Sequence, residues 1–143
     1  MTPKEMFLEA MRRNDAGDHE AFLAMQADDA VWRVPGAELH GKEELRGWLH
    51  PFWQGFSSYR HEFSRVVEAG DDVVWAEGTF SGVNDGPLVM PDGGEAPPTG
   101  RPVSFRFGMS IVGDYEAEQA KEINIYFDQL EFLAQLGLVP EPA

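Results

Sequence analysis

The chain has 143 residues, of which 43% are hydrophobic and 12% aromatic, and four of the rings are Trp. This length predicts one domain over residues 1–143, and the large rings are typical of proteins that enclose a ligand cavity. The 25 acidic and 11 basic side chains leave a formal net charge of −14, and there is no cysteine. The charge argues against nucleic-acid and anionic membrane partners, and the absence of thiols excludes disulfides and sulfur-ligated metal.

The N-terminal third predicts helices followed by one strand. Thr2 and Pro3 begin a helix that ends at the segment 15–18, and a short second helix carries Phe22 and Leu23. Asp28 and Asp29 end that helix, and residues 30–34 form a strand that stops at Pro35-Gly36. A third helix is predicted over 42–54, with Pro51 kinking or splitting it.

The remainder of the chain predicts a β-rich half. Strands are expected at 60–68, 73–81, 102–112 and 121–127, with a hairpin turn at 70–72. The Gly- and Pro-rich stretch 82–100 lacks periodicity, and its apolar residues Leu88, Val89 and Met90 suggest a lid. A short helix over 128–136 closes the chain before Gly137. Helices followed by consecutive strands predict an α+β fold, a cone-shaped curved mixed or antiparallel sheet wrapped around three N-terminal helices.

Several stretches share their order and spacing with one superfamily. They are DAGD at 15–18, ADDAVWRVPG at 27–36, HGKEEL at 40–45, PPTGRPV at 97–103 and the segment from Tyr126 to Gly137. The chain resembles the SnoaL-like polyketide cyclases of the nuclear transport factor 2-like superfamily, which includes ketosteroid isomerases and limonene epoxide hydrolases. The resemblance implies the cone fold, an apolar pocket and a homodimer.

The catalytic groups of these relatives do not carry over to the matching positions. The acid/base Asp of the SnoaL-like cyclases falls on Ile125 and a His of that family on Phe107, while the base Asp of the ketosteroid isomerases falls on Val34. The Arg and Asp of the epoxide hydrolase branch fall near Glu77 and Thr79. The resemblance therefore implies the fold and the apolar pocket of these relatives, but not their catalytic mechanisms.

Side-chain alternation along the strands, together with the resemblance, predicts the pocket wall. The expected ligand-binding residues share large or apolar side chains, apart from one Thr. They are Trp32, Val34, Trp48, Phe52, Trp53, Trp75, Thr79, Phe105, Phe107, Met109, Ile123 and Ile125. The alternative is that these rings only fill the core.

Glu77 is the acid expected in this pocket, as a proton-transfer group or a ligand anchor, with pairing to Arg65 or Arg106 on the outer face as the alternative. His61 is a weaker candidate that could meet a pocket acid. The four His, at 19, 40, 50 and 61, show no metal-ligand spacing, so neither metal nor cofactor is expected.

Three functions remain open from the sequence. The first is a SnoaL-like cyclase that folds an apolar polyketide-type intermediate in its pocket without the family's Asp chemistry. The second is a non-catalytic protein that binds a small apolar molecule, and the third is an isomerase or epoxide hydrolase that uses Glu77. No signal peptide or membrane segment is recognised, so a cytoplasmic protein is expected.

Overall fold

The computed structural model describes residues 1–89 and 93–140. Its helices are α1 (Pro3–Asp15), α2 (His19–Leu23), α3 (Gly41–Gly55) and α4 (Gln129–Gln135). Its strands are β1 (Gln26–Val34), β2 (Ala37–His40), β3 (Tyr59–Ala69), β4 (Val73–Val83), β5 (Leu88–Val89), β6 (Glu95–Ala96), β7 (Pro102–Asp114) and β8 (Gln119–Phe127).

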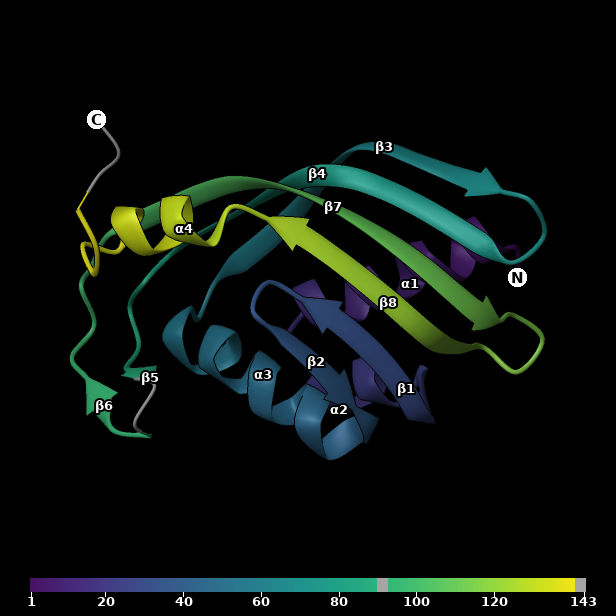
Figure 1. Cartoon of the computed structure of the whole chain (residues 1–143), viewed down its shortest axis with the longest axis horizontal. Coiled ribbons are helices and arrows are strands. Elements are labelled where there is room, and N and C mark those ends of the chain that lie inside the picture. Colours follow the sequence, from purple (N-terminus) through teal and green to yellow (C-terminus); the bar gives the residue numbers. More distant parts are fainter. Residues whose placement is uncertain (90–92, 141–143) are drawn as a thin grey trace.

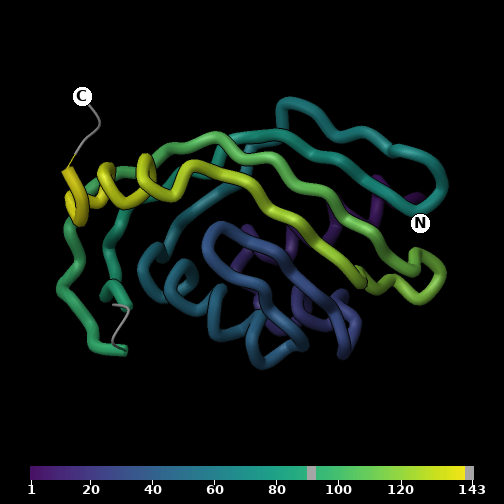
Figure 2. Tube along the Cα trace, in the orientation of Figure 1, coloured from purple at the N-terminus to yellow at the C-terminus, as the bar shows by residue number. Residues whose placement is uncertain are grey.

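The main sheet has six strands in the order β2-β1-β8-β7-β4-β3, and β5 pairs with β6 in a separate small sheet. All neighbouring strands in the main sheet are antiparallel except β1 and β8, which run parallel. The long strands arch over α1, α2 and α3, and α4 lies beyond the end of β8 (Figures 1 and 2). The predicted α+β class with a curved sheet around N-terminal helices is confirmed.

The ends of the helices follow the capping signals of the sequence. Thr2 accepts a hydrogen bond from the backbone N–H of Glu5 at 3.1 Å, with Pro3 in the first turn of α1. Asp128 caps α4 by accepting from two backbone N–H groups, and Gly137 follows with a φ of +77°. Local sequence is enough to fix these boundaries.

One local prediction was wrong, and one alternative of another is excluded. Asp28 and Asp29 do not end a helix but lie exposed within β1, where the pairing with β8 shifts register between Gln26 and Val31. A bulge of this kind lets two adjacent polar residues project from a strand that is buried on both sides of them, at Ala27 and Ala30. Pro51 lies inside the single helix α3, which excludes the predicted split, while the predicted kink stays a prediction. The short strand β2 was not predicted.

The predicted loop at 82–100 contains β5 and β6, and Leu88 is buried while Val89 is half-buried. Met90 lies outside the described residues. The role of this loop as a lid stays a prediction.

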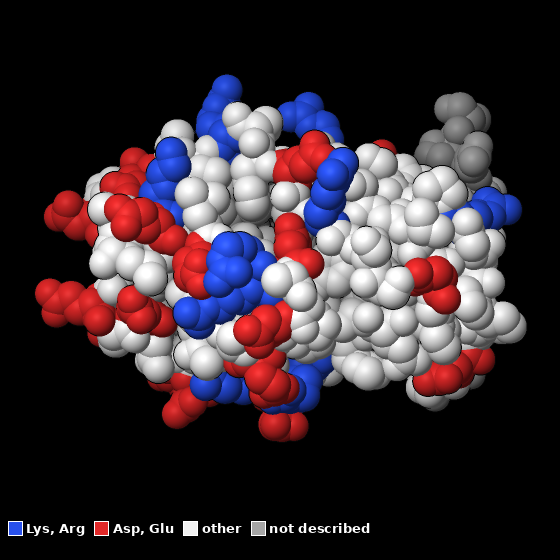
Figure 3. Space-filling view, turned by 180° about the vertical axis from the view of Figure 1, so that it is seen from behind, with Lys and Arg blue, Asp and Glu red and all other residues white. Residues whose placement is uncertain are grey.

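Charged side chains gather at one end of the molecule. Figure 3 shows acidic groups projecting at the left, the end where Figure 1 places the β3–β4 and β7–β8 turns. Asp71, Asp72, Asp114, Glu116 and Glu118 are exposed in or beside these turns. The acidic groups of these turns therefore lie at the outer end of the strands, away from the space between the sheet and the helices.

Candidate functional site

An internal cavity of about 100 Å³ lies between the concave face of the sheet and α1, α2 and α3. No Asp, Glu, Lys or Arg side chain lines it, and most of its wall consists of aromatic rings and aliphatic groups. Apolar walls with a few polar groups are the usual composition of small-molecule sites. The polar side chains of the lining, apart from indole N–H groups, are Asn14, Gln26, Tyr59 and His61.

Nine of the twelve expected wall residues border this cavity. They are Trp32, Trp48, Phe52, Trp53, Phe105, Phe107, Met109, Ile123 and Ile125. Val34 is buried with 8% of its surface exposed, but it does not border the cavity. The binding role of the nine stays a prediction.

The predicted facing of β4 was wrong. Trp75, Glu77 and Thr79 lie on the outer face of the sheet, and the buried residues of β4 are the alternate ones, among them Ala76 and Phe80. The Trp75 Nε1–H group donates to Glu77 Oε1 at 3.1 Å, and Arg65 Nη1 lies 3.5 Å from Glu77 Oε2. Glu77 is therefore one partner of an outer-face ion pair and not a cavity acid.

The pairing of β4 with β7 gives the physical reason. Phe80 lies opposite Phe105, and Gly78 lies opposite Phe107. Directly opposite residues share a face of the sheet, so inward-facing Phe105 and Phe107 require inward-facing Phe80 and Gly78. The prediction placed Glu77 on the same face as Phe105 and Phe107, which amounts to an alignment error of one residue in β4. A shift of one residue moves every side chain of a strand to the opposite face of the sheet.

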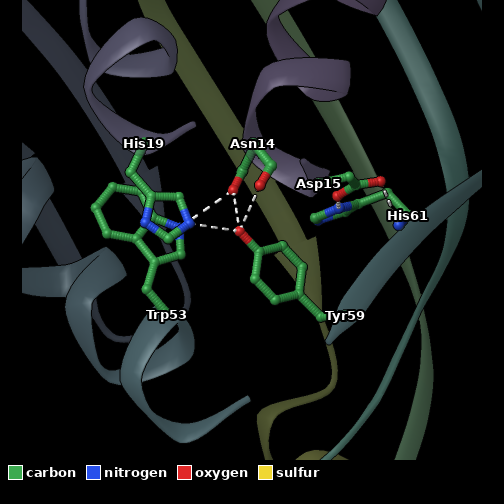
Figure 4. Close-up of polar contacts among 6 residues, drawn as sticks. All are labelled: Asn14, Asp15, His19, Trp53, Tyr59 and His61. Atoms are coloured by element: carbon green, nitrogen blue, oxygen red, sulfur yellow. Dashed lines mark hydrogen bonds and ion pairs between the residues drawn. The ribbon is translucent and has the colours of Figure 1, made fainter. Parts of the chain in front are cut away.

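His61 lines the cavity and is held by Asp15, a residue at the end of α1 (Figure 4). His61 Nδ1 lies 2.6 Å from Asp15 Oδ1, and the backbone N–H of His61 donates to Asp15 Oδ2 at 3.0 Å. The imidazole packs edge-on against the rings of Phe80 and Phe107. One carboxylate thus fixes both the backbone and the ring of His61.

This arrangement decides which ring nitrogen can act on a ligand. A carboxylate only accepts, so Nδ1 of His61 carries the proton that is donated to Asp15, and in the neutral ring Nε2 then holds a free lone pair. Nε2 has no hydrogen-bond partner within the described part of the chain. Among the lining residues, His61 is the one imidazole, so it is the side chain that can take up a proton at a ring nitrogen.

A second polar group joins α1, α2, α3 and β3 at the same end of the cavity (Figure 4). Tyr59 Oη lies 2.7 Å from the backbone oxygen of Asn14 and 2.6 Å from its Oδ1, and His19 Nε2 lies 3.0 Å from Tyr59 Oη. Trp53 Nε1–H donates to Asn14 Oδ1 at 3.1 Å, and the Trp53 ring stacks on His19 at 3.9 Å.

Burial shifts two pKa values in this group. Desolvation, followed by the nearby charge of Asp15, raises the pKa of the Tyr59 hydroxyl above its ordinary value. Desolvation also lowers the pKa of His19, and the charges of Asp18 and Glu20 oppose that shift. Both side chains are therefore held neutral near pH 7.

The sequence reasoning named His61 but missed Asp15 and Asn14. Both belong to the polar end of an amphipathic helix, where such residues usually serve as stop signals. Asp15 and His61 are 46 positions apart, and no local spacing links them. An acid at the end of a cavity-lining helix was the only available signal.

Neither a metal cluster nor a membrane helix is found where the chain is described. Residues 1–89 and 93–140 contain no group of three or more His, Cys, Asp or Glu residues that could hold a metal ion. Over the same ranges, no helix combines the length and apolar character needed to cross a membrane.

The chain is an α+β protein with a curved six-stranded sheet and a mostly apolar cavity beneath it. The profile of the SnoaL-like domain matches residues 5–112, and the chain belongs to this family. The resemblance found in the sequence is confirmed. No curated protein gives a significant sequence match.

Solved structures share the fold at low sequence identity. AclR, a proposed hydroxylase from Streptomyces galilaeus, is 17% identical, with 98% of this chain and 83% of that chain covered at a TM-score of 0.79. A proposed polyketide cyclase from Pseudomonas putida is 20% identical, with coverage of 95% and 98% and a TM-score of 0.74. TerC, co-crystallised with polyporic acid, is 18% identical, with coverage of 93% and 96% and a TM-score of 0.66.

Proposed function

We propose that this chain is a SnoaL-like cyclase that closes a ring in an apolar, polyketide-type intermediate held in the internal cavity. Family membership supports a role of this class, and proteins of the same fold include a proposed polyketide cyclase and a protein co-crystallised with polyporic acid. The observation that carries the proposal is His61, the one imidazole in a cavity that no Asp, Glu, Lys or Arg side chain lines, oriented by Asp15.

The cavity walls supply orientation. A flexible substrate surrounded by rings is restricted to compact conformers, which places its reacting atoms close together and excludes water. About 100 Å³ is less than the roughly 300 Å³ at the lower end of small-molecule pockets. We therefore expect the half-buried lining rings of Phe52 and Phe127 to move aside when substrate enters.

His61 supplies the proton transfer that the apolar walls cannot. Its Nε2 takes a proton from a carbon next to a carbonyl group, and that carbon then attacks a second carbonyl of the same molecule. The new C–C bond forms as the attacked C=O bond opens, and the resulting oxygen takes the proton back from Nε2. Asp15 does not exchange this proton; it holds the ring in the required tautomer and stabilises the imidazolium.

Binding without turnover is the second candidate. It is favoured by Val34, Phe107 and Ile125, which stand where the resemblance places the catalytic groups of relatives. The isomerase or hydrolase alternative built on Glu77 is not retained, because that side chain lies on the outer face.

The test uses 1-phenylhexane-1,3,5-trione, which closes to 5-phenylresorcinol with loss of one water. Ring closure is followed by absorbance for the wild type, for His61→Ala and for His40→Ala, a control in which the substituted side chain is 61% exposed. We expect the wild type to accelerate closure, His61→Ala to lose roughly 10²- to 10⁴-fold of that rate, and His40→Ala to retain it.

Each outcome separates the candidates. If the protein binds the trione but does not accelerate ring closure over buffer, the cyclase proposal is wrong and non-catalytic binding is the function supported. Full activity in folded His61→Ala would assign the proton transfer to another group.

A further inference from the structure

Two buried amide side chains on the cavity wall are held by tryptophan. Trp53 Nε1–H donates to Asn14 Oδ1, and Trp32 Nε1–H donates to Gln26 Oε1, each at 3.1 Å. Asn14 exposes 6% of its surface and Gln26 exposes 1%, and both border the cavity. The two pairs come from different elements, since Asn14 lies in the last turn of α1 and Gln26 begins β1.

The chemistry of the indole fixes the orientation of both amides. An indole N–H only donates, so it must face the amide oxygen, and the opposite orientation would set two donors against each other. For Asn14 it is the Trp53 indole that sets this orientation, since the Tyr59 hydroxyl 2.6 Å from Oδ1 can either donate or accept. In each residue the amide oxygen therefore faces the indole, and the NH₂ group points away from it.

These NH₂ groups have no acceptor in the described part of the protein. No hydrogen bond from Asn14 Nδ2 or Gln26 Nε2 is formed there. Within the same residues, no fully enclosed side-chain nitrogen or oxygen lacks a partner. Each NH₂ group is therefore not fully enclosed by protein atoms, and both residues border the cavity.

We propose that Asn14 Nδ2 and Gln26 Nε2 are two donor subsites that bind two acceptor oxygens, carbonyl or enolate, of one ligand. The proposal rests on the proposed function in placing the ligand in this cavity, but it needs no turnover. A hydrocarbon of the same shape would seal the two NH₂ groups away from water without an acceptor, which is costly for buried donors. A ligand with oxygens at both places satisfies them, so the amides select for oxidised, carbonyl-bearing molecules.

The arrangement also explains the rings that hold the amides. Trp32 is 2% exposed and packs edge-on against Phe22 and Trp48, while Trp53 stacks on His19. Each amide is thus oriented by a side chain that is itself locked by packing, which is the condition for a pre-formed hydrogen-bonding site.

The test compares three ligands with one skeleton: butylbenzene, 1-phenylbutan-1-one and 1-phenylbutane-1,3-dione. They carry zero, one and two carbonyl groups. Dissociation constants are measured with the wild type by calorimetry and by tryptophan fluorescence. Because one hydrogen bond contributes about 0.5–1.5 kcal/mol, each carbonyl should tighten binding roughly 2- to 12-fold. Equal affinity for the three ligands would overturn the proposal without any variant.

Two substitutions test the assignment to residues. Asn14→Asp and Gln26→Glu keep an acceptor for the tryptophan N–H and replace the NH₂ donor with oxygen. At pH 8 each should reduce affinity for the diketone at least to that of the monoketone, while affinity for butylbenzene changes less. Gln129→Glu makes the same chemical change at an exposed position of α4 and serves as the control.

The possible results are distinct. If folded Asn14→Asp and Gln26→Glu bind the diketone as the wild type does, the subsites are wrong even if ring closure occurs. If affinity rises with each carbonyl of the ligand series but the trione is not turned over, the two subsites are supported and the cyclase proposal is wrong. Circular dichroism of each variant checks the fold, and the wild-type series decides the matter if neither variant folds.

Discussion

The pair formed by Asp15 and His61 makes one prediction that needs no substrate. Asp15 accepts from two donors of His61, the ring Nδ1–H at 2.6 Å and the backbone N–H at 3.0 Å. Asp15→Asn replaces one of the two acceptors by an NH₂ donor. The amide oxygen can serve only one of the two donors, so the structure allows two arrangements.

In the first arrangement the amide oxygen faces Nδ1–H and the NH₂ group opposes the backbone N–H. A half-buried donor is then left unpaired, at about 1–3 kcal/mol. In the second, the oxygen accepts from the backbone N–H and the NH₂ group donates to Nδ1, which must give up its proton. Both hydrogen bonds survive, so this arrangement is favoured, and the proton moves to Nε2 of His61.

We therefore expect Asp15→Asn to keep the free energy of unfolding within about 1 kcal/mol of the wild type while exchanging the tautomer of His61. Asp15→Ala, which satisfies neither donor, should cost about 2 kcal/mol, or roughly 6 °C in Tm. Long-range ¹H–¹⁵N correlation spectra report the tautomer directly, and urea unfolding reports stability. An Asp15→Asn spectrum with the proton still on Nδ1 would refute the reasoning.

Other expectations follow from particular contacts. Gly78→Ala would place its Cβ 2.2 Å from the backbone oxygen of Glu62, so it should lower the free energy of unfolding by about 3 kcal/mol in urea. Gly47→Ala in α3, where the new Cβ meets no atom within 4 Å, should raise it by about 0.5–1 kcal/mol. An unchanged free energy of unfolding for Gly78→Ala would show that β3 can move. Glu77→Gln should leave the affinity for 1-phenylbutane-1,3-dione unchanged in calorimetry, and a loss of tenfold would return this side chain to the site. Burial lowers the pKa of His19 below its ordinary 6.5, so the unfolded chain takes up the proton first and stability should fall as the pH falls below about 6.5; His19→Gln should weaken this dependence in urea unfolding between pH 7.5 and 5.

Local signals in the sequence were sufficient for most elements. The Thr2 cap, the Asp128 cap and the turn at Gly70, whose φ is +74°, depend on neighbours a few residues away. The bulge around Asp28 and Asp29 was missed because two adjacent acids are an ordinary turn signal. Only pairing with β8 turns that segment into part of a strand.

The catalytic and donor groups of the proposed site depend on contacts between distant segments. His61 was a candidate from the sequence, but its partner Asp15 comes from another element. Asn14 and Gln26 look like ordinary polar residues near helix and strand ends. Their orientation follows from Trp53 and Trp32, which reach them only in the folded chain.

By itself, the sequence determined the fold class, the family resemblance and the identity of nine rings and aliphatic groups that border the cavity. Alternation along β4 also showed that Glu77 and Phe80 lie on opposite faces. Which of them faces inward was decided only by the register of β4 against β7, which places Phe80 opposite Phe105. A period of two defines the two faces of a strand, and only its neighbours in the sheet decide which face is buried.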